Sequence, residues 1–230
     1  MSGVAVLVVA AAYVIGSVPV PHLAGRARGV DIRRLGSGNV GASNVGESVS
    51  RALLVPVGIA EIAQGLAGVL IARGAGLGEE AQVAAGIAVV VAHNWNPWLR
   101  LAGGRGVGPA IGFLLALTPL GGLLAFVIVA LVGVPFRASA QSIAAGLVAA
   151  PGGAIGAGAS AVVVAGCACI AALVLTKRVL ANGPPGPQAG RPGVWVNRLL
   201  YDRDIREREA WVRRGLPGET AEADTSAAAR

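Results

Sequence analysis

Long apolar segments, separated by short polar ones, fill the chain from its start to residue 176. A helix needs roughly 20 apolar residues to cross the hydrocarbon core of a bilayer. Residues 4–19, 52–72 and 82–99 have suitable length and composition, and each segment predicts one membrane-spanning helix. No basic region precedes the first segment and no obvious cleavage site follows it, so it is predicted to be a retained span and not a signal peptide.

Two longer apolar stretches contain helix breakers. Residues 107–136 include Thr118 and Pro119, and residues 142–176 include Pro151 and several glycines. Because proline interrupts the hydrogen bonds of a helix, each stretch is predicted to form either one long span or a pair of shorter helices. The pattern therefore predicts an all-α, polytopic membrane bundle of five to seven transmembrane helices.

The chain changes character after residue 176. Residues 177–193 are rich in proline and glycine, which predicts a linker after the transmembrane domain of residues 1–176. Residues 194–214 are charged and predict a cytoplasmic helix at the membrane surface. The apolar side of this helix would consist of Trp195, Leu199, Leu200, Ile205 and Trp211. Residues 215–230 predict a disordered tail.

The composition is that of an integral membrane protein. Hydrophobic residues make up 54% of the chain and charged residues 13%, and the mean hydropathy is +0.68, so there are too few charges to cover a soluble globule. The two cysteines, Cys167 and Cys169, are two residues apart in an apolar run, where a helix would point them to different faces. They predict neither a disulfide nor a metal site.

Positive charge sets the expected orientation. Five arginines against two acids lie between residues 25 and 51, whereas only three uncharged residues precede the first span. Since positively charged loops stay in the cytoplasm, the N-terminus is predicted to lie outside and this loop inside. Five and seven crossings both return the C-terminus to the cytoplasm, and only seven would place Arg137 there. The net charge of +7 arises from these loops and the tail, and without interleaved aromatic residues it does not indicate nucleic-acid binding.

A glycine-rich loop, LGSGNVGASN at residues 35–44, follows the first span. Its small residues let several backbone amides converge on one anion, and its polar side chains add donors. The predicted phosphate cradle consists of Gly36, Ser37, Gly38, Asn39, Gly41, Ser43 and Asn44, with Arg33 and Arg34 as nearby charges. The same composition is also typical of ordinary turns, so a plain loop is the alternative.

A second glycine-rich turn follows the third span, in HNWNPWLRLAGGRG. Gly103, Gly104, Arg105 and Gly106 place a cation at the start of the next helix, whose N-terminal end attracts anions. His93 stands where the span meets water, beside tryptophans typical of a membrane interface. Two anion-binding turns on one membrane face predict a substrate with one or two phosphates, with His93 next to it.

Two polar residues, Glu61 and Gln64, lie near the middle of the second predicted span, one helical turn apart on one face. An ionisable group at that depth is a candidate functional residue. The alternative is a protonated glutamate that bonds a neighbouring helix and has a structural role only. The sequence does not decide between these two interpretations.

Four motifs in one order and spacing carry a resemblance: GSVP at residues 16–19, GVDIRRLGSGNVGASN at 29–44, EIAQG at 61–65, and HNW with GGRG within 93–106. In these motifs the chain resembles the bacterial acyl-phosphate-dependent glycerol-3-phosphate acyltransferase family. The resemblance implies a multi-pass enzyme of the bacterial cytoplasmic (inner) membrane. Such an enzyme moves an acyl chain from acyl phosphate to the primary hydroxyl of glycerol 3-phosphate, giving lysophosphatidate and phosphate in phospholipid biosynthesis without a cofactor.

The resemblance also suggests a role for each part of the site. Acyl phosphate is already activated, so positioning, a base and stabilisation of developing charge would suffice. His93 would take the proton of the acceptor hydroxyl. Ser37, Asn39 and the backbone amides of the first turn would hold one phosphate or the carbonyl oxyanion, and Arg105 would neutralise another phosphate. Membrane lipids surround the enzyme, and the acyl chain need not enter water.

Several positions depart from the family pattern. Glu47 stands where an arginine is usual, and Gln64 and Ala102 replace lysines. Near the C-terminus, Pro192 and Trp195 take the places of a histidine and an asparagine. The leading hypothesis is an active acyltransferase in which the lost cations are covered by Arg33, Arg34 or Arg105. The alternatives are a related transferase with another donor or acceptor, and a non-catalytic membrane protein that binds or moves a phosphorylated lipid.

Overall fold

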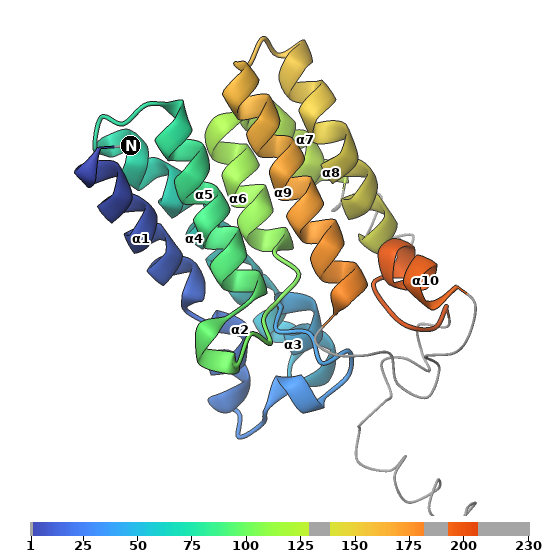
Figure 1. Ribbon diagram of the computed structural model, residues 1–230. Helices are drawn as coiled ribbons and strands as arrows, with labels where there is room; N and C mark the ends of the chain where they lie inside the picture. Colours follow the sequence, from blue (N-terminus) through green and yellow to red (C-terminus); the bar gives the residue numbers. More distant parts are fainter. Residues whose placement is uncertain (1, 129–138, 182–192, 207–230) are drawn as a thin grey trace, which may run out of the picture.

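The computed structural model describes residues 2–128, 139–181 and 193–206, which form helices joined by turns (Figure 1). The predicted all-α fold is confirmed for these ranges, in which no strand occurs. The longer helices are α1 (Gly3–Ser17), α4 (Leu54–Gly74), α5 (Glu79–Asn94), α6 (Val107–Leu117), α7 (Pro119–Ile128), α8 (Ser139–Gly156) and α9 (Ala161–Leu180). The shorter ones are α2 (Val20–Arg26), α3 (Ala42–Ser48), α10 (Val194–Tyr201) and the single turns η1 (Ile32–Arg34), η2 (Arg51–Leu53) and η3 (Pro97–Leu99).

Polar contacts between helix termini define one end of the bundle. Arg73, near the C-terminus of α4, donates to Gln82 Oε1 and, over 2.7 Å, to the Ala116 carbonyl of α6. The Ser160 hydroxyl, which caps α9, donates to the Glu79 carboxylate of α5. The opposite end carries α2, α3, α10 and the turn between α5 and α6 (Figure 1). The two glycine-rich motifs therefore lie at the same end of the bundle.

Both long apolar stretches form pairs of helices, and only the first pair is separated next to a proline. The chain breaks at Thr118 between α6 and α7, as one of the two alternatives predicted. The second stretch also forms a pair of helices, α8 and α9, but the break lies at the glycines and not at Pro151: α8 continues through this proline to Gly156, and the chain turns at Gly158, where φ is +73°. Proline removes only one helical hydrogen bond, and membrane helices tolerate that loss when the freed group is satisfied locally.

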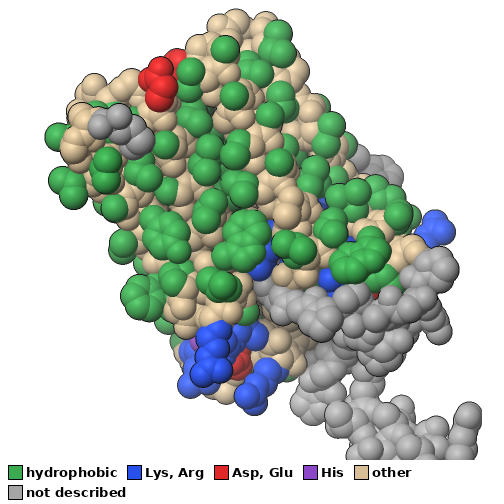
Figure 2. All heavy atoms as spheres, in the orientation of Figure 1, with side chains coloured by type: hydrophobic (Ala, Val, Ile, Leu, Met, Phe, Trp, Pro, Cys, Tyr) green, Lys and Arg blue, Asp and Glu red, His purple; other side chains and the backbone are tan. Residues whose placement is uncertain are grey.

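The surface of the bundle suits a lipid environment. Within the described ranges, three helical segments are long and apolar enough to span a membrane: Gly3–Arg26, Arg51–Gly74 and Ala161–Leu180. Large apolar side chains face outward, including Leu7 at 71% exposure and Ile59 at 62%. Figure 2 shows hydrophobic side chains along the bundle and a group of Lys and Arg side chains at one end. Arg137, on which the choice between five and seven crossings depends, lies outside the described residues.

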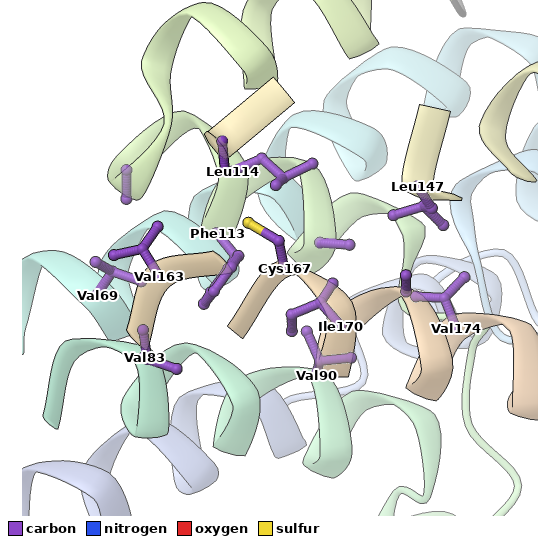
Figure 3. Close-up of a cluster of buried hydrophobic side chains, with 14 residues drawn as sticks. Val69, Val83, Val90, Phe113, Leu114, Leu147, Val163, Cys167, Ile170 and Val174 are labelled. Carbon is purple, nitrogen blue, oxygen red and sulfur yellow. The ribbon is translucent and has the colours of Figure 1, made fainter. Parts of the chain in front are cut away.

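Phe113 of α6 lies in the main hydrophobic cluster, which also takes side chains from α4, α5, α8 and α9 (Figure 3). Its ring packs against Gly86 of α5 and Gly166 of α9, where a Cβ atom would crowd it. Cys167 is buried in the same cluster and Cys169 is exposed, in agreement with the prediction that they point to different faces. The described residues contain no group of side chains that would hold a metal ion.

Glycines bring α4 and α6 into backbone contact. A Cβ atom at Gly65 would collide with the Pro109 backbone, and one at Gly112 would collide with the Ile62 carbonyl. Small residues allow such close approach between membrane helices. The contact matters for the site, because it places Gly108, in the first turn of α6, against the side chain of Glu61.

Candidate functional site

The Asn44 side chain organises the first glycine-rich loop. Asn44 lies in the first turn of α3 and is only 2% exposed. Its amide nitrogen donates to the carbonyls of Ile32, Leu35 and Asn39 at 2.9, 3.1 and 3.0 Å. Its amide oxygen accepts a hydrogen bond from the Ser37 backbone amide. Asn44 therefore shapes the cradle, and its amide is committed to the loop instead of being available to a ligand.

Two glycines give the loop its conformation. Gly36 and Gly38 have φ values of +52° and +67°, which residues with a side chain rarely adopt. A Cβ atom at Gly36 would also crowd the Ser48 hydroxyl, which donates to Asn44 Oδ1. Ser37, between the two glycines, accepts a hydrogen bond at Oγ from the backbone amide two residues on. The loop thus has a fixed backbone path, with Ser37 at its half-buried tip.

Glu61 and His93 meet between this loop and the end of α5. One Glu61 carboxylate oxygen accepts from the Ala42 amide, at the N-terminus of α3, over 3.4 Å. The other oxygen lies 3.7 Å from His93 Nε2. Both side chains are buried, at 6% and 4% exposure. A carboxylate at this position could stabilise an imidazolium, which is the basis of the role proposed for Glu61 below.

The second glycine-rich turn packs directly on His93. The Gly104 amide donates to the His93 carbonyl over 3.1 Å. A Cβ atom at Gly103 would collide with that carbonyl, and one at Gly104 would collide with the imidazole and with the Val40 carbonyl. Gly106, the N-cap residue immediately before α6, has a φ of +74°. Both glycine-rich motifs thus surround one histidine, which agrees with a single site built from the two turns.

Several buried polar atoms near His93 have no hydrogen-bond partner within the described residues. They are Asn39 Oδ1, Glu61 Oε1, both amide atoms of Asn94, and Arg105 Nη1. Leaving such an atom unpaired costs about 1–3 kcal/mol, so these atoms can gain by bonding a polar ligand. Asn94 was not among the site residues predicted from the sequence, although its position next to His93 in the HNW motif indicated that it lies at the site.

The three predicted arginines are engaged in different ways. Arg33 forms an ion pair with Asp31 at 2.6 Å, and its hydrogen bonds hold the pKa of the Asp31 carboxyl well below its usual range. Arg34 is exposed. Arg105 is buried, and its Nε donates to Asp202 Oδ1 over 2.6 Å. Of the three, Arg105 is the one that belongs to the turn packed on His93.

Two other predicted site residues lie apart from the histidine. Gln64 donates from Nε2 to the carbonyls of Ile15 and Val18 at 2.7 and 3.0 Å. It therefore satisfies the C-terminal end of α1, where helix carbonyls otherwise have no partner. Ser43 is an exposed residue on α3. Glu61 and Gln64 are thus neighbours on one helix with separate partners.

The C-terminal segment docks on the same end of the bundle. Arg198 of α10 is buried, pairs with Asp204 at 2.5 Å, and donates to the carbonyls of Val179 and Leu180 at the end of α9. Asp202, which follows α10, reaches Arg105. Segments far apart in the sequence are therefore joined at the candidate site.

The predicted surface helix is shorter than expected. α10 ends at Tyr201, and residues 202–206 are not helical. The remainder of that helix, 207–214, the predicted tail, 215–230, and residues 182–192 of the predicted linker lie outside the described residues. Trp195 is 53% exposed, as a residue at a membrane surface would be.

Comparison with known proteins finds relatives that share one description. The family model "Glycerol-3-phosphate acyltransferase" matches residues 6–181. Glycerol-3-phosphate acyltransferase 4 of Dehalococcoides mccartyi (strain CBDB1) is 32% identical over 222 residues, which cover 93% of this chain and 95% of the relative. Glycerol-3-phosphate acyltransferase 1 of Deinococcus radiodurans is 40% identical over 128 residues, 56% of this chain and 65% of the relative.

A solved structure is similar in fold. It is the crystal structure of PlsY (YgiH), an integral membrane glycerol 3-phosphate acyltransferase, in its glycerol 3-phosphate form. The similarity covers 76% of this chain and 88% of that one, with a TM-score of 0.72 and 28% sequence identity. The prediction of a membrane-integral fold agrees with this neighbour.

The substitution Asn44→Asp tests the organising role of the Asn44 amide. We expect it to lower the free energy of unfolding by about 1–3 kcal/mol, because a carboxylate cannot donate to the three loop carbonyls. Thermal unfolding in detergent and hydrogen exchange at residues 35–41 measure the effect. Glu80→Gln, the reverse exchange at an exposed position of α5, is the control and should change neither. Wild-type stability and exchange in Asn44→Asp would contradict the role.

Proposed function

Because this chain belongs to the glycerol-3-phosphate acyltransferase family, we propose that it transfers an acyl chain from acyl phosphate to the primary hydroxyl of glycerol 3-phosphate. The products would be lysophosphatidate and inorganic phosphate. The observation that carries the proposal is the meeting of His93 and Glu61 between two glycine-rich turns. The structural neighbour PlsY is known in a glycerol 3-phosphate form and a lysophosphatidic acid form, which supports the same acceptor and product.

The reaction requires no covalent intermediate with the enzyme. The acceptor oxygen attacks the acyl carbonyl carbon while His93 takes the hydroxyl proton. The tetrahedral intermediate then collapses, and the bond between the acyl carbon and the phosphate oxygen breaks. Phosphate leaves with the electron pair of that bond and can receive the proton from His93, which restores the neutral imidazole.

Each side chain of the site has a part in this scheme. Glu61 stabilises the imidazolium formed when His93 takes the proton. Ser37, Asn39 and the backbone amides of their loop hold a phosphate or the oxyanion of the intermediate. Arg105 balances phosphate charge beside His93. Burial strengthens these electrostatic interactions, because water is excluded from the charges involved.

We also propose that the site faces the cytoplasm of a bacterial cell and that the N-terminus lies outside. The arginine-rich segment around α2 and η1 supports this orientation through the positive-inside rule. Outward-facing apolar side chains of the spanning helices would contact lipid, so the acyl chain of both donor and product can stay in the bilayer.

Cysteine labelling tests this orientation. In a variant with Cys167 and Cys169 replaced by alanine, we expect a cysteine at Arg28 to react with an impermeant reagent only from the cytoplasmic side. A cysteine at Glu80, exposed at the other end of the bundle, should react only from outside. Right-side-out and inverted vesicles supply the two conditions. The reverse pattern would contradict the proposed orientation.

An activity assay tests the proposed reaction. The purified protein in lipid vesicles, given acyl phosphate and labelled glycerol 3-phosphate, should form labelled lysophosphatidate and release phosphate in equal amounts. The Dehalococcoides mccartyi relative serves as a parallel sample. If that relative were active and this chain formed no lysophosphatidate under the same conditions, the chain would require another donor or acceptor.

Substitution of His93 tests the proposed base. We expect His93→Gln to reduce kcat on the order of 10²–10⁴-fold, because proton transfer by a positioned side chain contributes about that much. Binding of glycerol 3-phosphate, measured by calorimetry, should change little. His22→Gln is the matched control at the chain's other histidine, which lies 3.6 Å from Asp31 and outside the site. Unchanged turnover in a folded His93→Gln variant would remove the histidine from the base role.

A further inference from the structure

Lys177, the only lysine of the chain, is buried beside the site although none of the sequence motifs includes it. It lies in the last turn of α9 and is 2% exposed. Its Nζ donates to the Leu101 carbonyl over 3.4 Å and lies 5.4 Å from the centre of the Trp95 ring. It forms no ion pair with a carboxylate of the described residues. A buried ammonium with so few partners is unfavourable unless an anion joins it.

The backbone next to Lys177 is held in an uncommon conformation. Arg100 and Leu101 both have positive φ, +54° and +65°, which is unfavourable for residues with a side chain. Leu101 forms the carbonyl contact with Lys177, and the chain continues at once into the turn that contains Arg105. Such strain is retained where the surrounding structure imposes it, and it is common at binding sites.

Charge is out of balance in this part of the structure. The buried cations are Arg105, Lys177, Arg178 and Arg198, and the carboxylates that pair with members of this group are Asp202 and Asp204. Arg178 donates instead to the Ala140 and Leu199 carbonyls. Asp202 acts on Arg178 as well as on Arg105, so two carboxylates face four buried cations, and two positive charges of this group are in excess among the described residues. A phosphate monoester carries about −1.5 to −2 charges near pH 7, which would balance them.

The charge of Lys177 acts on both Arg105 and His93. The positive charges of Lys177 and Arg105 repel each other, and the charge of Lys177 disfavours a second positive charge on His93. Arg105 donates from Nε to Asp202, which orients its guanidinium, while Nη1 is buried without a partner in the described part of the chain. Lys177, which contacts the Leu101 carbonyl, and Arg105, four residues further along the same turn, thus present two like charges with unused donors.

We propose that Lys177 and Arg105 together bind the phosphate group of one of the two substrates. This inference rests on the proposed function for the identity of the substrates. Lys177 is a binding residue here, and the cation–π contact with Trp95 keeps its ammonium in place when no substrate is bound. The phosphate belongs either to glycerol 3-phosphate or to acyl phosphate, and the experiment separates these two sources.

A single lysine makes the site directly observable. Full-length protein labelled with ¹³C,¹⁵N-lysine and placed in detergent micelles should give one lysine side-chain signal. We expect this signal to shift saturably with either glycerol 3-phosphate or a non-transferable acyl phosphonate, and not with glycerol. A shift with glycerol 3-phosphate assigns the acceptor phosphate, and one with the phosphonate assigns the donor. No shift with either ligand, or a shift only with inorganic phosphate far above substrate concentrations, would overturn the proposal.

Variants provide the functional arm of the test. Lys177→Gln should raise KM for the assigned substrate about 10- to 100-fold while KM for the other substrate changes little, because hydrogen bonds to a charged group are lost. Lys177→Arg should recover most of this loss. Arg100→Gln removes the same charge from an exposed neighbour and is the control. Unchanged KM values for both substrates in a folded Lys177→Gln protein would overturn the proposal.

The two hypotheses fail in different ways. If the wild-type protein forms no lysophosphatidate, the proposed reaction is wrong, whereas the lysine signal still tests the phosphate site by binding alone. If transfer occurs and the lysine signal does not respond to either phosphate ligand, the reaction stands and the role of Lys177 is wrong. If Lys177→Gln does not fold, the titration of the wild-type protein decides.

Discussion

Buried polar groups at the end of a membrane bundle must find partners inside the protein, and the Asn44 side chain meets this requirement for the first glycine-rich loop. Three loop carbonyls depend on its amide nitrogen, and the Ser37 amide depends on its oxygen. The fixed loop presents the start of α3 to Glu61, and Glu61 in turn faces His93. The position of the proposed base therefore depends on an asparagine that need not touch the substrate.

The site also depends on glycine, because the backbone segments around it lie closer together than residues with a side chain would allow. Gly65 and Gly112 bring the backbones of α4 and α6 together, and Gly103 and Gly104 let the second turn lie on His93. In each case a single Cβ atom would fill the space. Gly103 and Gly104 thus have a packing role besides the anion binding proposed for their turn.

Much of the fold could be predicted from the sequence, because hydrophobic length alone identifies spanning helices such as α1 and α4. The site was predicted only in outline. Composition cannot show that Asn44 supports the loop while Asn39 leaves an oxygen unpaired, since both are asparagines in one motif. Nor does helical spacing show that Glu61 joins the site while Gln64 caps α1. Residue 177 was predicted to begin the linker of residues 177–193, whereas Lys177 lies buried in the last turn of α9.

The cations of the site illustrate why sequence motifs alone are insufficient in a divergent chain. Positions 64 and 102, where the resemblance led us to expect lysine, carry glutamine and alanine. The contact of Lys177 with the Leu101 carbonyl places an ammonium next to position 102, although 75 residues separate Lys177 from Ala102 in the sequence. The electrostatic energy of a bound phosphate depends on where the positive charge lies and not on which helix carries the charged residue. A charge lost from one segment can therefore be supplied by another that packs against it, and burial is what distinguishes such a residue from the exposed arginines nearby.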